Sequence, residues 1–121
     1  MKIELINLDG WMACARALVN KLEADNDAKA KTQPGSPDFL KLQTDITRIL
    51  AAIQTHSNNG LRMVDEQVAQ SQLAKDLATA AANAETQTKQ LKNAAASLAQ
   101  LADWTNKLTQ IVSQFGSLLH L

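Results

Sequence analysis

Apolar residues recur at steps of three and four along most of the chain, a spacing that places them on one face of an α-helix. The stripe in the stretch 37–57 consists of Phe39, Leu42, Ile46, Ile49, Ile53 and His56, with Leu50 beside it. A second stripe begins just before the stretch 9–31 and consists of Leu8, Trp11, Ala15, Leu18 and Leu22, with Met12 and Val19 beside it. The pattern therefore predicts helices over about 9–31 and 37–57. Residues 2–8 alternate weakly, which leaves a short strand and the first turns of a helix as two open interpretations.

Proline and glycine residues separate these stretches. Both prolines lie in the segment 32–38, TQPGSPD, whose composition is typical of a turn. Ser36 stands where a helix N-cap is expected, Pro37 suits the first helical position, and Asp38 suits the positive end of a helix. A second turn is predicted at 57–60, where Gly60 is placed to follow the end of a helix.

A third stripe is longer than the other two and keeps alternating steps of four and three without a slip. It reads Leu73, Leu77, Ala80, Ala84, Gln87, Leu91, Ala94, Leu98, Leu101, Thr105, Leu108, Val112, Phe115 and Leu119. A repeat held over this length is typical of a coiled-coil seam. The sequence therefore predicts a long helix over about 61–119.

The length of this helix is itself informative. At about 1.5 Å per residue it would extend roughly 88 Å, against about 30 Å for each of the first two helices. Two short helices cannot cover it, so either it breaks near 82–85 to give a four-helix bundle, or it stays continuous and another chain covers the rest. Three consecutive alanines at 80–82, and the lack of Gly or Pro there, favour continuity. Either way we expect one all-α domain over 1–121.

The balance of acidic and basic side chains argues against two kinds of partner, nucleic acids and acidic lipids. The chain has 12 basic and 12 acidic side chains, which balance locally as well as overall. Nucleic-acid binding is expected to show as a basic patch, and recognition of acidic lipids needs one too. We therefore expect no nucleic-acid partner, and membrane contact is the minority interpretation.

The location of the protein follows from similar arguments. The longest unbroken apolar runs have five residues, too few to span a bilayer, and Glu4 interrupts the region where a signal peptide would be apolar. The default expectation is a cytoplasmic protein, with export by a route without a cleaved signal left open. Cys14 is the only cysteine, so an intrachain disulfide and a thiolate cluster are both excluded. In its apolar surroundings we expect a buried thiol.

No set of residues predicts a catalytic, metal or cofactor site. His56 and His120 have no acidic residue at helical spacing, so capping a helix or facing solvent is the expectation for both. The carboxylates Glu23, Asp25 and Asp27 lack the glycine and the final glutamate of a calcium loop, and they are expected at a fraying, solvated helix end.

Other catalytic patterns are missing as well. The acidic pair at 65–66 occupies adjacent positions, whose side chains point apart on a helix. The sequence has no G-x-S-x-G motif and no phosphate-binding glycine loop. We therefore expect a protein that is not an enzyme and needs no cofactor.

The expected function is protein binding through helix packing, as a scaffold, an adaptor or a chaperone-like protein. The candidate interface with a protein partner, either a second copy in a homo-oligomer or another helical protein, consists of Leu91, Leu98, Leu101, Trp104, Leu108, Val112, Phe115 and Leu119. The alternative is a membrane-active or secreted protein that uses the amphipathic stretch 108–121. The composition of 73–119 is similar to helical hairpins of bacterial chemoreceptors, secreted translocator proteins and phasins, and this similarity assigns no role to any residue.

Overall fold

The computed structural model describes residues 5–60, 72–93 and 97–118, and its described part consists of four α-helices. These are α1 (Leu5–Ala30), α2 (Pro37–Gly60), α4 (Gln72–Asn93) and α5 (Leu98–Leu118). The predicted all-α fold is confirmed. Residues 5–8 belong to α1, so the helical interpretation holds for them, while residues 2–4 lie outside the described part of the chain.

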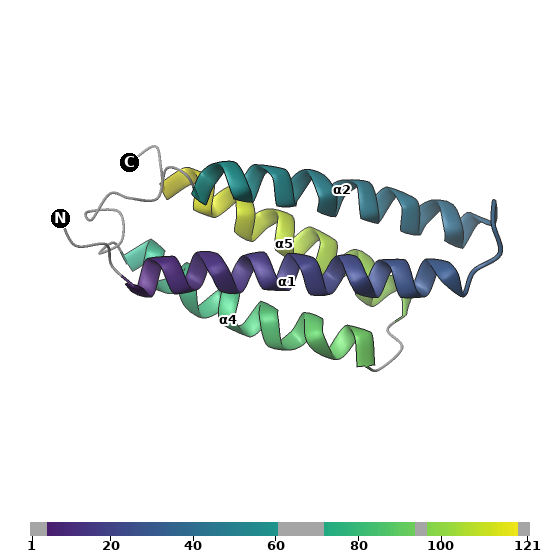
Figure 1. Ribbon diagram of the computed structural model, residues 1–121, viewed down its shortest axis with the longest axis horizontal. Coiled ribbons are helices and arrows are strands. Elements are labelled where there is room, and N and C mark those ends of the chain that lie inside the picture. Colours follow the sequence, from purple (N-terminus) through teal and green to yellow (C-terminus); the bar gives the residue numbers. More distant parts are fainter. Residues whose placement is uncertain (1–4, 61–71, 94–96, 119–121) are drawn as a thin grey trace.

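The helices form a four-helix bundle in which α1 and α4 run in one direction and α2 and α5 in the other (Figure 1). α1 packs against α2 and α4, and α5 packs against the same two helices from the opposite corner. α1 also reaches α5 across the bundle. Segment 61–71 thus joins helices at opposite corners, and each helix has one parallel and one antiparallel neighbour.

The first turn follows the sequence prediction closely. The Phe39 backbone N–H donates to the Ser36 hydroxyl at 3.2 Å, so Ser36 is the N-cap of α2 and Pro37 takes the first helical position. Gly35 has a φ of 82°, a left-handed conformation that a side chain would strain. The turn is therefore specified by residues within it: Gly35 with its left-handed conformation, Ser36 as the N-cap and Pro37 at the first helical position.

The prediction of one continuous helix over 61–119 is wrong, because α4 ends at Asn93 and α5 begins at Leu98. Residues 82–85, where a break was considered, lie inside α4, and the separation falls instead between Asn93 and Leu98. The Ser97 backbone N–H donates to the Gln100 side-chain oxygen at 2.9 Å, and the Gln100 backbone N–H donates to the Ser97 hydroxyl at 3.2 Å. This reciprocal pair is a capping box, which starts α5 as a separate helix. α5 then packs back against α4, so one half of the seam covers the other.

Small residues bring α1 and α4 unusually close. A Cβ atom at Gly10 would lie 2.7 Å from Ala78 Cα, nearer than real Cβ contacts allow. The contact continues through Ala13, Ala17, Ala81 and Ala84, all buried. Because alanine side chains end at Cβ, the two backbones can approach along their length.

The interior divides into a large and a small apolar cluster. The large cluster consists of Ala13, Cys14, Ala17, Leu18, Ile49, Ala52, Leu77, Ala81, Ala84, Leu108, Ile111, Val112 and Phe115. The small cluster consists of Ala24, Leu42, Leu91 and Leu101. Phe115 is the one aromatic residue among these buried side chains, so the core is thin and depends on close helix approach.

We predict that Gly10→Ala lowers the free energy of unfolding by about 1–3 kcal/mol, because the new methyl group meets the Ala78 backbone and forces α1 and α4 apart. Thermal and urea unfolding would measure the change. Asn26→Ala, at an exposed position of the same helix, is the control for helix propensity and is expected to be neutral or slightly stabilising. An equal gain in stability for both variants would contradict the close contact.

Candidate functional site

The predicted interface lies inside the bundle. Its buried members are Leu91, Leu101, Leu108, Val112 and Phe115. Leu98 and Trp104 are half-buried and pack against the core clusters, while Leu119 lies outside the described residues. The premise that this seam needs another chain to cover it is wrong, because α5 returns along the bundle and buries its stripe against the other three helices.

The C-terminal stripe is likewise part of the core. Leu108, Ile111, Val112 and Phe115 contribute to the large cluster, so a membrane could meet them only if α5 left the bundle. Within the described residues, no helix combines the length and the apolar character that a membrane span requires.

A buried ion pair separates the two apolar clusters. The Lys21 ammonium group donates to both carboxylate oxygens of Asp25 at 2.7 Å and to the Thr105 hydroxyl at 2.9 Å. Both charged side chains have 0 % exposure. The Thr105 hydroxyl donates in turn to the Leu101 carbonyl at 3.1 Å. The group therefore links α1 to α5 through fully satisfied polar atoms.

This arrangement corrects the expectation that Asp25 lies at a fraying, solvated helix end. Glu23 and Asp27 are exposed as expected, but α1 continues to Ala30 and turns Asp25 inward. Burial raises the pKa of Asp25 to about 6, against the opposing attraction of Lys21. Burial also lowers the pKa of Lys21, because it disfavours the charged ammonium. Desolvation therefore outweighs the attraction within the pair.

We predict that removing one partner of this pair costs more than removing both. Lys21→Met or Asp25→Leu alone leaves a buried charge without a counter-charge and is expected to lower the free energy of unfolding by about 3–5 kcal/mol. The double variant is expected to be close to the unmodified protein or more stable, because an apolar pair carries no desolvation cost. A double-mutant cycle from urea unfolding measures the coupling. Additive losses would contradict the pairing.

His56 lies in an aromatic cluster at the other end of the large core. Its ring stacks on Trp11 with centroids 4.8 Å apart and meets the edge of Phe115 at 5.3 Å. His56 Nε2 lies 2.8 Å from the Trp11 carbonyl, and the Trp11 indole N–H donates to the His56 carbonyl at 2.9 Å. Since a carbonyl only accepts, Nε2 carries the proton, and the buried Nδ1 has no partner among the described residues.

The expectation that His56 caps a helix or faces solvent is therefore wrong. α2 continues past His56 to Gly60, and the imidazole serves as a core ring. Burial lowers its pKa, with the hydrogen bond to Trp11 as a smaller opposing effect, so the ring is neutral near pH 7. His120 lies outside the described part. Among the described residues, no group of three potential ligands could hold a metal ion.

We predict that His56 makes the bundle sensitive to acid. Its folded pKa is lower than its unfolded pKa, so its contribution to stability is present above about pH 6.5 and is lost as the pH falls. The difference in unfolding free energy between the unmodified protein and His56→Gln should shrink between pH 7 and pH 5, by up to about 1.4 kcal/mol per pH unit. Asp25 changes stability in the opposite sense but is common to both proteins. A pH-independent difference would contradict a buried, neutral ring.

Cys14 fits the prediction of a buried thiol. It has no exposed surface, and burial raises its pKa to about 12. The thiol is therefore protonated and inaccessible, which makes it a small apolar side chain of the core rather than a nucleophile.

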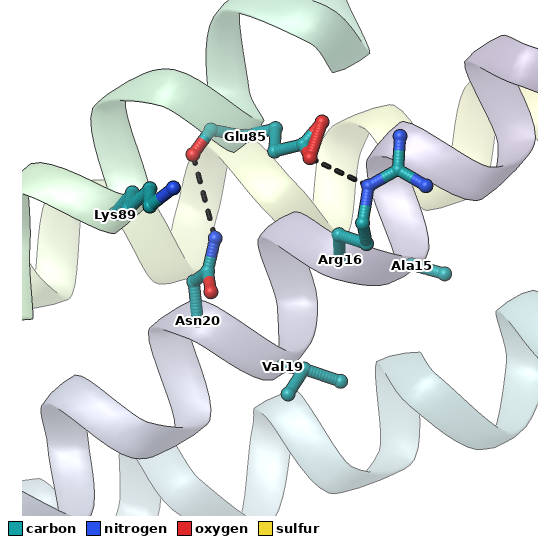
Figure 2. A pocket seen from close by; sticks show the side chains of 6 residues that line it. All are labelled: Ala15, Arg16, Val19, Asn20, Glu85 and Lys89. Carbon is teal, nitrogen blue, oxygen red and sulfur yellow. Dashed lines mark hydrogen bonds and ion pairs between the residues drawn. The ribbon is translucent and has the colours of Figure 1, made fainter.

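An open depression lies between α1 and α4 on the outside of the bundle (Figure 2). The Arg16 guanidinium bonds to the Glu85 carboxylate at 2.5 Å, and the Asn20 amide donates to the Glu85 carbonyl at 3.4 Å. Lys89 lies at the rim, and Val19 points away from Glu85. The one carboxylate is already engaged by Arg16, so these contacts hold α1 against α4 and do not resemble a catalytic arrangement.

The exposed large apolar side chains of the described residues gather on two helices. Met12 and Val19 of α1 are 43 % and 46 % exposed, and Leu40 and Leu50 of α2 are 53 % and 51 % exposed. The antiparallel register of the two helices is fixed at both ends. Trp11 lies against His56, and the Lys29 ammonium lies 5.1 Å above the Phe39 ring. That register places Val19 and Leu50 at about the same height along the pair.

We call this surface the hairpin face. It consists of Met12 and Val19 from α1 and the exposed α2 residues Leu40, Gln43, Thr44, Thr47, Leu50, Ala51 and Gln54. Its α2 part carries no charged side chain, whereas on α1 the exposed Arg16 lies between Met12 and Val19 and the exposed Glu23 lies one turn after Val19. The hydroxyls of Thr44 and Thr47 donate to the carbonyls one turn earlier, at 3.1 and 3.0 Å, so their capacity to donate is used within the helix.

Sequence reasoning missed the hairpin face. The pattern places Met12, Val19 and Leu50 beside the core stripes, and it does not separate flanking residues that are buried from flanking residues that are exposed. For Leu50 a signal was available: the charges of α2 at 38, 41, 45 and 48 follow helical spacing along one flank, which leaves its outward side uncharged.

Searches with the chain found no matching protein-family model, no similar curated protein and no similar solved structure.

Proposed function

We propose that the protein is a non-enzymatic helical interaction protein that binds a protein partner through the hairpin face. The observation that carries this proposal is the exposure of Met12, Val19, Leu40 and Leu50 on the outer side of α1 and α2, where the α2 part of the surface is uncharged. Interfaces are depleted of charge at their centre and enriched in methionine, which fits this surface. Large apolar side chains grouped on one side need an explanation that scattered ones do not.

The contacts of the titratable side chains favour a binding function over a catalytic one. The buried ammonium, Lys21, is engaged by Asp25 and Thr105, and the buried imidazole of His56 is stacked and neutral. The carboxylate of the outer depression, Glu85, is bound by Arg16. General acid–base chemistry needs a titratable group within reach of a substrate. Each of these groups is instead engaged by neighbouring residues of the bundle.

The proposed binding leaves the bundle closed. The seam formed by Leu101, Leu108 and Phe115 stays in the core, and the partner meets side chains that are already outside. Packing then resembles ordinary helix contact, in which an apolar stripe of one helix lies in the groove of another.

The test compares two pairs of surface substitutions. Val19→Glu with Leu50→Glu places two acids on the hairpin face, and Thr79→Glu with Gln87→Glu places two acids on the exposed side of α4 as the matched control. A photo-reactive amino acid at Thr47, in the full chain expressed in its native host, reports contacts by cross-linking. We expect protein adducts from the unmodified face and from the α4 control, and a loss of at least ten-fold in the hairpin-face variant.

Two results would contradict the proposal. One is the complete lack of adducts from Thr47, either with a second copy or with another protein. The other is an equal adduct yield in the hairpin-face variant and the α4 control. Circular dichroism melting of each variant verifies that the substitutions, all at exposed positions, leave the bundle folded.

A further inference from the structure

We propose that the two buried polar groups make the bundle an acid-sensitive switch, with one end that opens in acid and one end that stays closed. At the end that opens, α1 separates from α2 at the contact between Trp11 and His56. At the other, the contact between Lys21 and Thr105 keeps α1 attached to α5. The inference goes beyond the proposed function and does not depend on the partner of the hairpin face. It rests on the hydrogen-bonding capacity of the two groups and on where the other charges lie.

The His56 ring has no place for a second proton while it stays in the core. Its Nε2–H group donates to the Trp11 carbonyl at 2.8 Å, and the residue is 1 % exposed. Protonation turns Nδ1 from an acceptor into a donor, and no described residue is a hydrogen-bond partner of that atom. Stacking on the Trp11 indole attracts a cation but supplies no acceptor for the new N–H group. A buried charge with an unsatisfied donor is costly, so the ring is protonated more readily outside the core.

Displacement of this ring weakens the contacts of three helices. The Trp11 indole N–H donates to the His56 carbonyl at 2.9 Å, so two reciprocal hydrogen bonds join the first half of α1 to the last turns of α2. The ring also meets the edge of Phe115 near the end of α5, with centroids 5.3 Å apart. When the ring leaves, the first hydrogen bond is lost, and both aromatic side chains lose their packing partner. The effect is therefore confined to the end of the bundle where these three residues meet.

The described charged side chains do not offset the cost of an imidazolium at this end. After position 48, α2 has no charged side chain apart from the ring itself, and α5 has none after position 107. On α1, Arg16 is exposed and is engaged by Glu85. On α4, Lys75 and Asp76 are exposed. Burial therefore dominates and lowers the pKa of His56, with the hydrogen bond to the backbone of α1 as a smaller opposing effect.

The buried ion pair responds to acid in the opposite sense. Burial raises the pKa of Asp25 to about 6, against the attraction of Lys21, and the nearby carboxylate of Asp45 raises it further. The folded bundle thus binds a proton at Asp25 more readily than the unfolded chain, so this contribution to stability grows as the pH falls from about 6 to about 4. Arg48 adds a like charge near the Lys21 ammonium, which keeps the Thr105 hydroxyl as an acceptor. Acid therefore does not weaken the contact between α1 and α5.

The proton acts on the two ends with opposite signs. His56 helps to hold its end closed above about pH 6.5, and this contribution is lost as the pH falls below that value. For each pH unit below about 6.5, the equilibrium between closed and open ends shifts towards the open form by up to about ten-fold. Parts of a protein can open with less free energy than the whole requires, so one end can respond while the rest stays folded.

Two thiols can report the opening of the two ends. Cys14 is the only cysteine, has no exposed surface and follows Trp11 by about one turn, so it becomes reactive when that end opens. In a second variant, Cys14→Ala with Ala24→Cys, the thiol lies in the small cluster, next to Asp25 in the chain. A dithiodipyridine reagent labels thiols in acid as well as at neutral pH. Its rate, divided by the rate for the unfolded chain at the same pH, measures how often each end opens.

We expect the normalised rate for Cys14 to rise at least about five-fold between pH 7 and pH 5, and the rate for the Ala24→Cys thiol to change less than about two-fold. His56→Gln and His56→Phe both remove the titration and should make the rate for Cys14 independent of pH. His56→Phe keeps a ring in the core, so the comparison survives if His56→Gln does not fold. Asp9→Asn and His120→Gln are controls for two other titratable groups and should leave the rise unchanged.

Three results would overturn the inference. An equal rise for both thiols would mean that acid destabilises the whole bundle and not one end. A rate for Cys14 that stays constant between pH 7 and pH 5 would mean that this end does not open. A rise that persists in both His56→Gln and His56→Phe would assign the response to a different group.

Discussion

The close approach of α1 and α4 determines where the large apolar side chains can go. With Gly10 against the Ala78 backbone and alanines along the rest of the contact, the two helices leave little room for side chains between them. The interior is then filled by a small number of leucine, isoleucine and valine side chains and one phenylalanine. Side chains that flank a stripe, such as Val19 and Leu50, remain on the rim of the bundle. The alanine-rich contact therefore accounts for the close packing of α1 on α4.

The buried ion pair adds a constraint on register. Lys21 reaches Asp25 within its own helix, but its third hydrogen bond is to Thr105 of α5. A shift of α5 by one turn, about 5.4 Å, would remove the hydroxyl and leave the ammonium with an unsatisfied donor in the core. Apolar clusters on either side tolerate small shifts more easily, because they are not directional. The polar group thus favours one alignment of α1 with α5.

The sequence predicted what depends on local signals. The turn before α2 was recognised because Ser36, Pro37 and Asp38 each act within one turn of helix, and the all-α class follows from periodicity. The break before Leu98 was missed because the seam continues through it in unbroken register. Its only local signal is the pair Ser97 and Gln100, which a helix interior also tolerates.

The buried polar group and the hairpin face were missed for a different reason. Asp25 stands in a polar run, yet Cys14, Leu18, Lys21 and Asp25 follow steps of four, three and four, which is the spacing of the core stripe. The two charges four residues apart on that stripe were the available signal for a buried pair. Whether a flanking leucine lies inside or outside depends on the distance between helices, and no single helix contains that information.

The energetics of opening favour association on the outside of the closed bundle. To offer the seam to a partner, α5 would have to uncover Leu101, Leu108 and Phe115, all almost completely buried. At about 2 kcal/mol for each such side chain, these three together contribute about 6 kcal/mol, which already exceeds the lower end of the roughly 5–15 kcal/mol that stabilises a typical domain. A partner on the seam would first have to replace that loss. A partner on the hairpin face meets Met12, Val19, Leu40 and Leu50 where they already contact water, so burying them is favourable and requires no prior opening of the bundle.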